Sequence, residues 1–146
     1  MISYGKHFID NQDIREAIKS LKSDYITQGP NVSLFEKKLK KKFSAHAAVV
    51  SSGTAALHLS GKALNWNSRD IVLTVPITFV ATANTVLYSG AKLGLVDIDP
   101  RTLNIDLNIL EKKLKLMQKK GKKVKSLIAV DYAGNPCDWE NIKYLS

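Results

Sequence analysis

Short apolar runs alternate with segments of helical period along this chain, and this alternation constrains the fold more than any other feature. Four runs, apolar on both faces and rich in β-branched residues, predict strands at 47–50, 71–75, 92–98 and 126–130. Strands without a polar face are buried on both sides, as in a parallel sheet covered by helices. We therefore predict an α/β fold with a mostly parallel sheet and flanking helices.

The helices between these strands have recognisable start signals. Apolar spacing predicts helices at 10–22, 34–43, 54–64, 79–89 and 106–119, and a last helix after Asp138. Asp10 or Asp13 is expected to cap the first helix, and Ser33 with Glu36 to form a capping box for the second. The last helix has only about two turns before Ser146, so we expect an incomplete domain.

Composition places the chain among ordinary globular proteins, with 45% hydrophobic and 24% charged residues. No apolar run approaches the roughly 18 residues of a membrane span, and the N-terminus lacks the apolar stretch of a signal peptide. The single cysteine, Cys137, excludes an internal disulfide and fits a reducing compartment. We therefore predict a cytoplasmic protein that does not bind membranes.

The formal net charge of +9 raises the question of nucleic-acid binding. The lysines concentrate at 37–42 and 112–125, on segments whose apolar residues keep helical spacing. They are then expected on solvated helix faces, and no aromatic residues are interleaved with them for base stacking. This distribution argues against nucleic acid as a partner, and a small basic RNA-binding domain stays an alternative with a distinct test, a steep salt dependence of binding.

The stretch Ser51-Ser52-Gly53-Thr54-Ala55 joins the first predicted strand to a helix. The free backbone N–H groups of a first helical turn, together with the helix dipole, favour a bound anion such as a phosphate. Gly53 lets such a group approach the backbone, and neighbouring hydroxyls can add hydrogen bonds. The alternative is an ordinary helix cap, because Ser and Thr cap many helices.

Two further turns are expected at the same edge of the sheet. The stretch 76–84 follows the second strand and 131–135 follows a later one, and ligands of parallel α/β sheets bind at the carboxyl ends of strands. Phe79 can stack on a flat ring there or pack in the core, and the pattern alone leaves both open. A phosphate cradle, an aromatic face and a polar turn together suit a planar phosphorylated cofactor.

Several long stretches of the chain form a specific pattern: SSGTAALHL, VPITFVATANTVLYSGAKLGLVDIDPRTLNID and VDYAGNP, with YGKHFID and ITQG near the start. In this order and spacing, they resemble the N-terminal half of the DegT/StrS family of sugar-nucleotide aminotransferases. The resemblance covers essentially the whole chain, and PITFVATAN and VDYAG are most similar to the branch that serves pseudaminic acid biosynthesis. It implies that residues 1–146 are an incomplete large domain of the aspartate-aminotransferase fold (PLP fold type I). Residues 1–32 are expected to form an N-terminal helix and a substrate-side loop, and residues 33–146 an α/β part. The family's C-terminal domain is expected to be absent from this chain.

The resemblance also implies a cofactor and its ligands. Family members use pyridoxal 5'-phosphate (PLP), so Gly53, Thr54 and Ala55 are expected to hold its phosphate, chiefly through backbone amides. Phe79 is expected to stack on the pyridine ring. His58, within a helix, is expected to be partly buried and structural, and no metal site is expected.

The implied reaction moves an amino group, with glutamate as the expected donor, onto a 4-keto-6-deoxy UDP-sugar to give the 4-amino sugar. The residues expected to border this substrate are Tyr4, Asp24, Tyr25, Ile26 and Thr27. A homodimer is expected for the intact enzyme.

The chain departs from the family pattern in one respect. The family's Schiff-base lysine and the acidic residue that pairs with the pyridine nitrogen follow the stretch matched by VDYAGNP, and neither context occurs before Ser146. We therefore assign no catalytic residue and expect the isolated chain to lack transaminase activity. The alternative is a non-catalytic binding or assembly module that pairs with a separately encoded C-terminal half.

Overall fold

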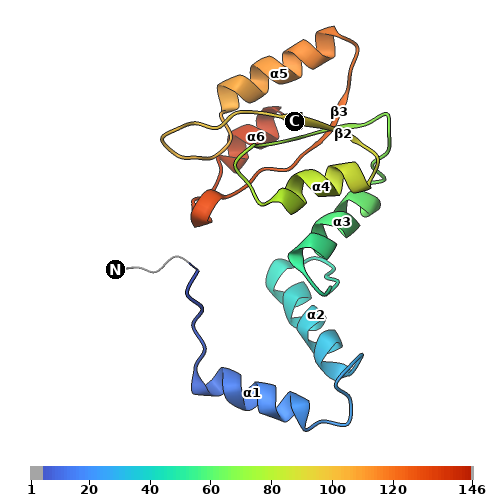
Figure 1. The fold of residues 1–146 in the computed structure, drawn as a ribbon, viewed down its shortest axis with the longest axis vertical. Coiled ribbons are helices and arrows are strands. Elements are labelled where there is room, and N and C mark those ends of the chain that lie inside the picture. The colour runs from blue at the N-terminus through green and yellow to red at the C-terminus, as the bar shows by residue number, and fades with distance from the viewer. Residues whose placement is uncertain (1–4, 146) are drawn as a thin grey trace. The chain divides into compact units, whose positions relative to one another are not determined.

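A computed structural model describes residues 5–145, and the chain divides between Val49 and Val50 into two compact units (Figure 1). The first unit holds two helices, and the second holds the sheet and the remaining helices. Each unit is described by itself.

The first unit contains α1 (Asn11–Leu21) and α2 (Pro30–Phe43). Asp10 caps α1, and a reciprocal hydrogen bond from its own backbone N–H to Asp13 completes a capping box, which confirms the predicted start. The predicted start of the second helix at 34 is wrong, because α2 begins at Pro30. Proline lacks the N–H that the first helical position leaves unused, so it starts a helix without a side-chain cap.

The predicted strand at 47–50 is not formed in the described part of the chain. Strand formation requires a neighbouring strand, and the ladders of the described residues join only the three strands of the second unit. The backbone N–H of Val49 donates instead to the carboxylate of Glu36, at 2.9 Å. Glu36 therefore binds this segment to α2. The capping box predicted for Ser33 and Glu36 is not formed in the described structure.

The second unit is built on a parallel sheet of β1 (Ile71–Thr74), β2 (Lys92–Leu95) and β3 (Val124–Leu127), in the order β2-β1-β3. The register pairs Ile71 with Lys92 on one side and with Val124 on the other. The strand predicted at 92–98 is shorter in the structure, where it is β2. After Val96 the chain leaves the ladder, and Ile98 bridges to Ile105. The strand predicted at 126–130 is displaced toward the N-terminus, because β3 starts at Val124 and ends at Leu127.

Helices lie on both faces of the sheet (Figure 1), and alternate residues of β1 pack against them. Leu73 faces a core shared with α5 (Leu107–Lys119) and α6 (Trp139–Leu145), whereas Val72 faces one shared with α4 (Val80–Tyr88). The helix α3 (Gly53–Ala63) packs on α4. A short 3₁₀ turn, η1 (Tyr132–Gly134), links β3 to α6. The predicted burial on both faces is confirmed for the central strand β1, whereas β2 and β3, at the edges of this sheet, are half-buried or exposed.

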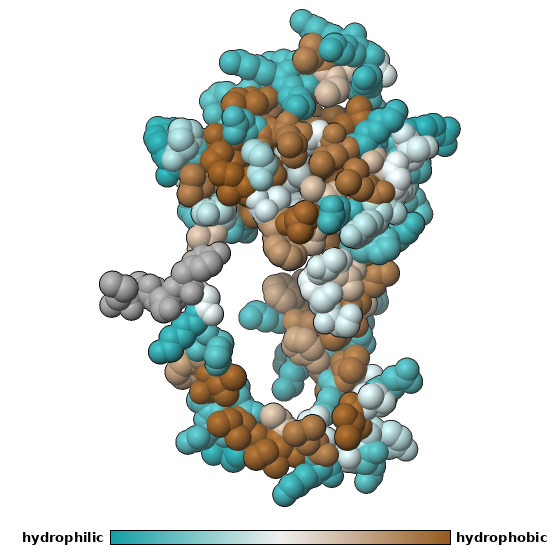
Figure 2. Space-filling view, viewed as in Figure 1, coloured by the Kyte–Doolittle hydropathy of each residue, from teal (hydrophilic) through white to brown (hydrophobic). Residues whose placement is uncertain are grey.

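The first unit has no comparable core. None of the residues in α1 or α2 is buried, and apolar side chains lie at the surface of both helices (Figure 2). The apolar spacing that predicted these helices therefore marks faces that remain exposed in this chain. No helix among residues 5–145 is long and apolar enough to cross a membrane.

Candidate cofactor site

The start of α3 presents unused backbone donors. Ser52 is extended and caps the helix: its Oγ accepts the N–H of Ala55 at 3.1 Å, and its carbonyl accepts the N–H of Ala56 at 3.0 Å. Among the described residues, the amides of Gly53 and Thr54 donate to no protein acceptor. Of the three residues expected to bind a phosphate, two thus offer a free N–H, and the N–H of Ala55 is already used.

Gly53 leaves open space above these donors. A Cβ placed on Gly53 meets no atom within 4 Å, and the residue is exposed. A phosphate oxygen can therefore approach the helix end, where the dipole favours negative charge. The residues present fit a phosphate group of the size and charge that PLP carries.

Phe79 lies at the start of α4, in the N-cap position, and 73% of its surface is exposed. Within the described chain Phe79 therefore does not pack in the core. The turn before it is fixed by a hydrogen bond of 2.8 Å between the hydroxyls of Thr78 and Thr82. An exposed ring at a fixed turn is available to stack on a planar ligand.

A ring contact joins the middle of α3 to the last residue of α4. The rings of His58 and Tyr88 meet edge to face with centroids 5.7 Å apart, and His58 is half-buried, as predicted. Its buried Nε2 has no hydrogen-bond partner in the described structure. No described hydrogen bond or ring contact joins Phe79 to residues 53–55, so the two candidate elements are placed separately at the starts of neighbouring helices.

The third turn, after β3, is held by a buried asparagine that the sequence analysis did not single out. The side-chain amide of Asn104 donates to the carbonyls of Asn135 and Pro136 at 3.0 and 3.1 Å. Its Oδ1 accepts the N–H of Tyr132 at 3.0 Å, and only 5% of the residue is exposed. Asn104 thereby fixes both ends of η1.

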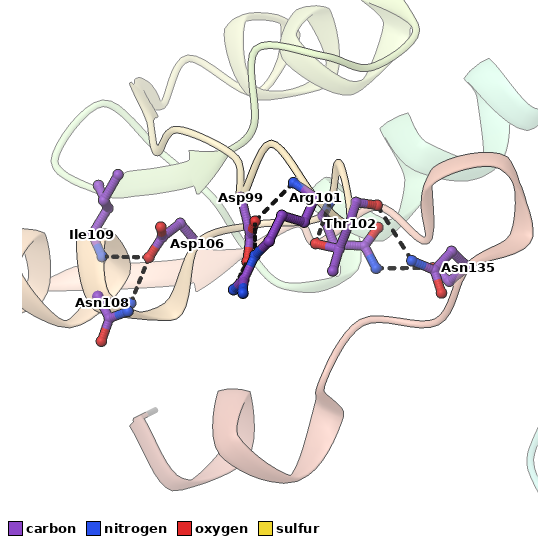
Figure 3. Close-up of polar contacts among 8 residues, drawn as sticks. Asp99, Arg101, Thr102, Asp106, Asn108, Ile109 and Asn135 are labelled. Carbon is purple, nitrogen blue, oxygen red and sulfur yellow. Dashed lines mark hydrogen bonds and ion pairs between the residues drawn. The ribbon is translucent and has the colours of Figure 1, made fainter.

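The loop that carries Asn104 is stabilised by its own polar contacts (Figure 3). Arg101 pairs with Asp99 at 2.8 Å, and this pairing lowers the pKa of the Asp99 carboxyl. Asp106 caps α5 by accepting the N–H groups of Asn108 and Ile109. The Nδ2 of Asn135 donates to the carbonyl of Thr102 at 3.3 Å, which ties this loop to the third turn a second time.

Asp131 also has a structural partner. Its Oδ1 accepts the N–H of Cys137 at 2.8 Å, and the Cys137 Sγ donates to the carbonyl of Val130. Burial raises the pKa of the Cys137 thiol to about 11, with the Asp131 carboxylate adding to the shift. A buried, protonated thiol of this kind is a core group and not a nucleophile.

The residues expected to border a substrate lie on the loop between α1 and α2. Asp24, Tyr25, Ile26 and Thr27 are all exposed, Tyr25 and Ile26 by 66% and 73%. The hydroxyl of Ser23 donates to the carbonyls of Ser20 and Tyr25, which fixes the start of the loop. Tyr4 lies outside the described residues. In the part of the chain that the structure describes, no cluster of three metal-ligating side chains occurs.

Solved structures give the class of protein that has this fold. The PLP form of a putative sugar aminotransferase of Streptococcus pneumoniae matches 99% of this chain and 36% of its own, with a TM-score of 0.82 and 26% identity. Helicobacter pylori PseC, an aminotransferase of pseudaminic acid biosynthesis, matches 98% of this chain and 38% of its own, with a TM-score of 0.82 and 32% identity. The fold is therefore that of the N-terminal part of sugar aminotransferases, as predicted.

The chain belongs to the DegT/DnrJ/EryC1/StrS aminotransferase family, whose model matches residues 7–146. The UDP-4-amino-4,6-dideoxy-N-acetyl-beta-L-altrosamine transaminase of Campylobacter jejuni is 39% identical over the whole chain. The spore coat polysaccharide biosynthesis protein SpsC of Bacillus subtilis is 37% identical over 97% of it. The chain spans 38% and 35% of the lengths of these two relatives. The family consists of PLP-dependent aminotransferases.

Proposed function

We propose that this chain forms the phosphate-binding part of a PLP-dependent transaminase that converts a 4-keto-6-deoxy UDP-sugar into the 4-amino sugar, for pseudaminic acid or another surface glycan. One observation supports it above the others: the two free amides at the start of α3, beneath open space at Gly53. This anion site belongs to a chain that is 39% identical to a UDP-amino-sugar transaminase.

In this proposal each candidate residue has a defined role. The amides of Gly53 and Thr54 hold the cofactor phosphate, while Ala55 completes the turn through its bond to Ser52. The exposed ring of Phe79 packs on the cofactor ring and keeps it from tilting. PLP, when bound, supplies the electron sink that amino-group exchange requires. No residue of this chain is assigned proton transfer.

The loop of the first unit is proposed to meet the substrate. Asp24, Tyr25, Ile26 and Thr27 are exposed on it and present a carboxylate, a phenol, an apolar side chain and a hydroxyl. Together with Tyr4, they are proposed to border the UDP-sugar, with glutamate as the amino donor and a homodimer as the working assembly. The large-domain assignment of residues 1–146 and the cytoplasmic location stay predictions from the sequence.

A chimeric enzyme tests the proposal. Residues 1–146 replace the matching segment of the Campylobacter jejuni transaminase, and PLP content and amination of a 4-keto-6-deoxy UDP-sugar are measured. We expect a PLP-loaded, active chimera in which Gly53→Val lowers PLP affinity most, because the added side chain stands where the phosphate approaches the backbone. Phe79→Ala should weaken PLP binding less, by about 1–3 kcal/mol.

Lys119→Ala, on the exposed end of α5, serves as the control that leaves PLP affinity unchanged. If Gly53→Val left the PLP affinity of a folded chimera unchanged, the assignment of the phosphate site to the start of α3 would be wrong. A folded chimera that never binds PLP would favour the non-catalytic module.

A further inference from the structure

A cavity of about 340 Å³ at the amino edge of the sheet is surrounded by basic side chains. Its lining contains five cationic residues and a single carboxylate: Arg69, Lys92, Lys122, Lys123 and Lys125 against Asp70. Buried Ile71 and the turn residue Gly121 complete the wall. The proposed roles of the chain leave this cavity unused.

The sheet topology explains why these cations converge. The amino ends of parallel strands lie at one edge, and each strand here begins beside a basic residue. Arg69 precedes β1, Lys92 begins β2, and Lys123 directly precedes β3. The register places Lys92 and Val124 on either side of Ile71, so the cations of β2 and β3 flank the start of the central strand.

The positive charge of this cavity is not neutralised within the described chain. The Oδ2 of Asp70 accepts the backbone N–H and the side-chain Nδ2 of Asn67, at 3.0 and 2.8 Å, and thereby closes the turn before β1. The described ion pairs join other residues and involve none of the five cations. The negative end of α5 favours a cation or two near Gly121, but the helix dipole amounts to only about half a charge.

We propose that this cavity binds a compact polyanion of linked phosphates, such as a tripolyphosphate chain or the phosphates of a nucleotide. Clustered like charges repel, and a multiply charged anion among them relieves that repulsion while gaining several charge-assisted hydrogen bonds. The volume is that of a small-ligand pocket. Its lining holds no aromatic side chain for base stacking, which disfavours RNA.

Titration of the 146-residue chain with sodium tripolyphosphate, by calorimetry at fixed ionic strength, tests the proposal. We expect one binding site per chain and at least tenfold weaker binding by the double variant Lys92→Gln/Lys125→Gln. Both side chains are exposed, so the fold should be retained, which thermal unfolding checks. Lys40→Gln/Lys41→Gln, on exposed positions of α2, removes the same charge and should keep the wild-type affinity.

Comparative ligands separate a local site from general electrostatics. Equal loss in the two double variants would overturn the proposal, as would orthophosphate binding as tightly as tripolyphosphate. RNA binding that strengthens with length and outcompetes tripolyphosphate would assign the surface to nucleic acid instead. A nucleoside triphosphate that binds more tightly than tripolyphosphate would support the site and identify a nucleotide as its source of phosphates. None of these outcomes depends on PLP.

Discussion

At the scale of single residues, the buried Asn104 joins two segments of the sheet-containing unit that are distant in sequence. Its amide group makes three hydrogen bonds to the backbone on the far side of the loop, with Asn135, Pro136 and Tyr132. The preceding residue, Leu103, has a positive φ of 61° and turns the chain so that this amide points inward. The turn after β3 therefore takes its shape from a side chain about thirty positions upstream.

We expect Asn104→Ala to lower the free energy of unfolding by about 2–4 kcal/mol, because it leaves buried backbone groups without partners. Urea unfolding followed by tryptophan fluorescence, to which buried Trp66 and partly exposed Trp139 both contribute, measures the change. Asn108→Ala, on an exposed neighbouring position, is the matched control and should stay within about 0.5 kcal/mol of the wild type. Equal stability of the two variants would show that the Asn104 bonds contribute nothing.

The sequence predicted some of these residues better than others, for physical reasons. Gly53 and Phe79 were placed at helix starts by the apolar spacing that follows them, although the strand predicted before Gly53 is not formed in the described chain, and Phe79 is exposed there. Asn104 gave no signal, because its partners are distant in sequence and an asparagine in a loop most often serves its own turn. Rules based on sequence spacing predict hydrogen bonds between nearby residues and not those between distant ones.

At the scale of elements, the starts of α1 and α5, which carry side-chain caps, were predicted to within a residue, whereas the uncapped start of α2 was not. Asp10 caps α1 and Asp106 caps α5, each within a few residues. The start of α2 was missed because Pro30 needs no side-chain cap. The segment 47–50 has strand composition, but in the described chain its Val49 amide is bonded to Glu36. The composition of a segment predicts its tendency to form a strand, but a strand forms only where a neighbouring strand is available for pairing.

Two glycines of α3 should respond in opposite ways to the same substitution. A Cβ at Gly61 stands 2.7 Å from the Oγ of Ser89 and 2.7 Å from the Cε3 of Trp66, whereas one at Gly53 meets nothing within 4 Å. Gly61→Ala should therefore destabilise the packing of α3 on α4 by about 1 kcal/mol or more, since overpacking outweighs the helix-propensity gain. Gly53→Ala should leave stability unchanged or slightly raised.

The same urea unfolding experiment compares the two variants, and each is the control for the other. A Gly61→Ala protein as stable as Gly53→Ala would mean that Ser89 and Trp66 move aside without cost, and the close approach of α3 and α4 would then be unimportant for stability.

At the scale of the whole molecule, the two units differ in how they are stabilised. The described core lies in the sheet and its helices, where β1 is buried throughout. In α1 and α2, by contrast, helical hydrogen bonds act without buried side chains, and only α1 has a side-chain cap at its start. Isolated helices of this length are marginal in water. The alternation of apolar runs and helical segments in this sequence therefore predicted the structure of the second unit more completely than that of the first.

The exposed apolar residues of the first unit should make the 146-residue chain associate. Leu34 and Phe35 of α2 are each 52% exposed, beside other exposed apolar side chains on α1 and α2 (Figure 2). Contiguous apolar surface of this kind favours burial against another molecule.

Sedimentation velocity over a hundredfold range of concentration should show mass-action association. Leu34→Ser/Phe35→Ser should shift it toward monomer, whereas Leu59→Ser/Leu116→Ser, at similarly exposed positions of the second unit, should not. A wild-type chain that stays monomeric at every concentration would show that this apolar surface drives no contact.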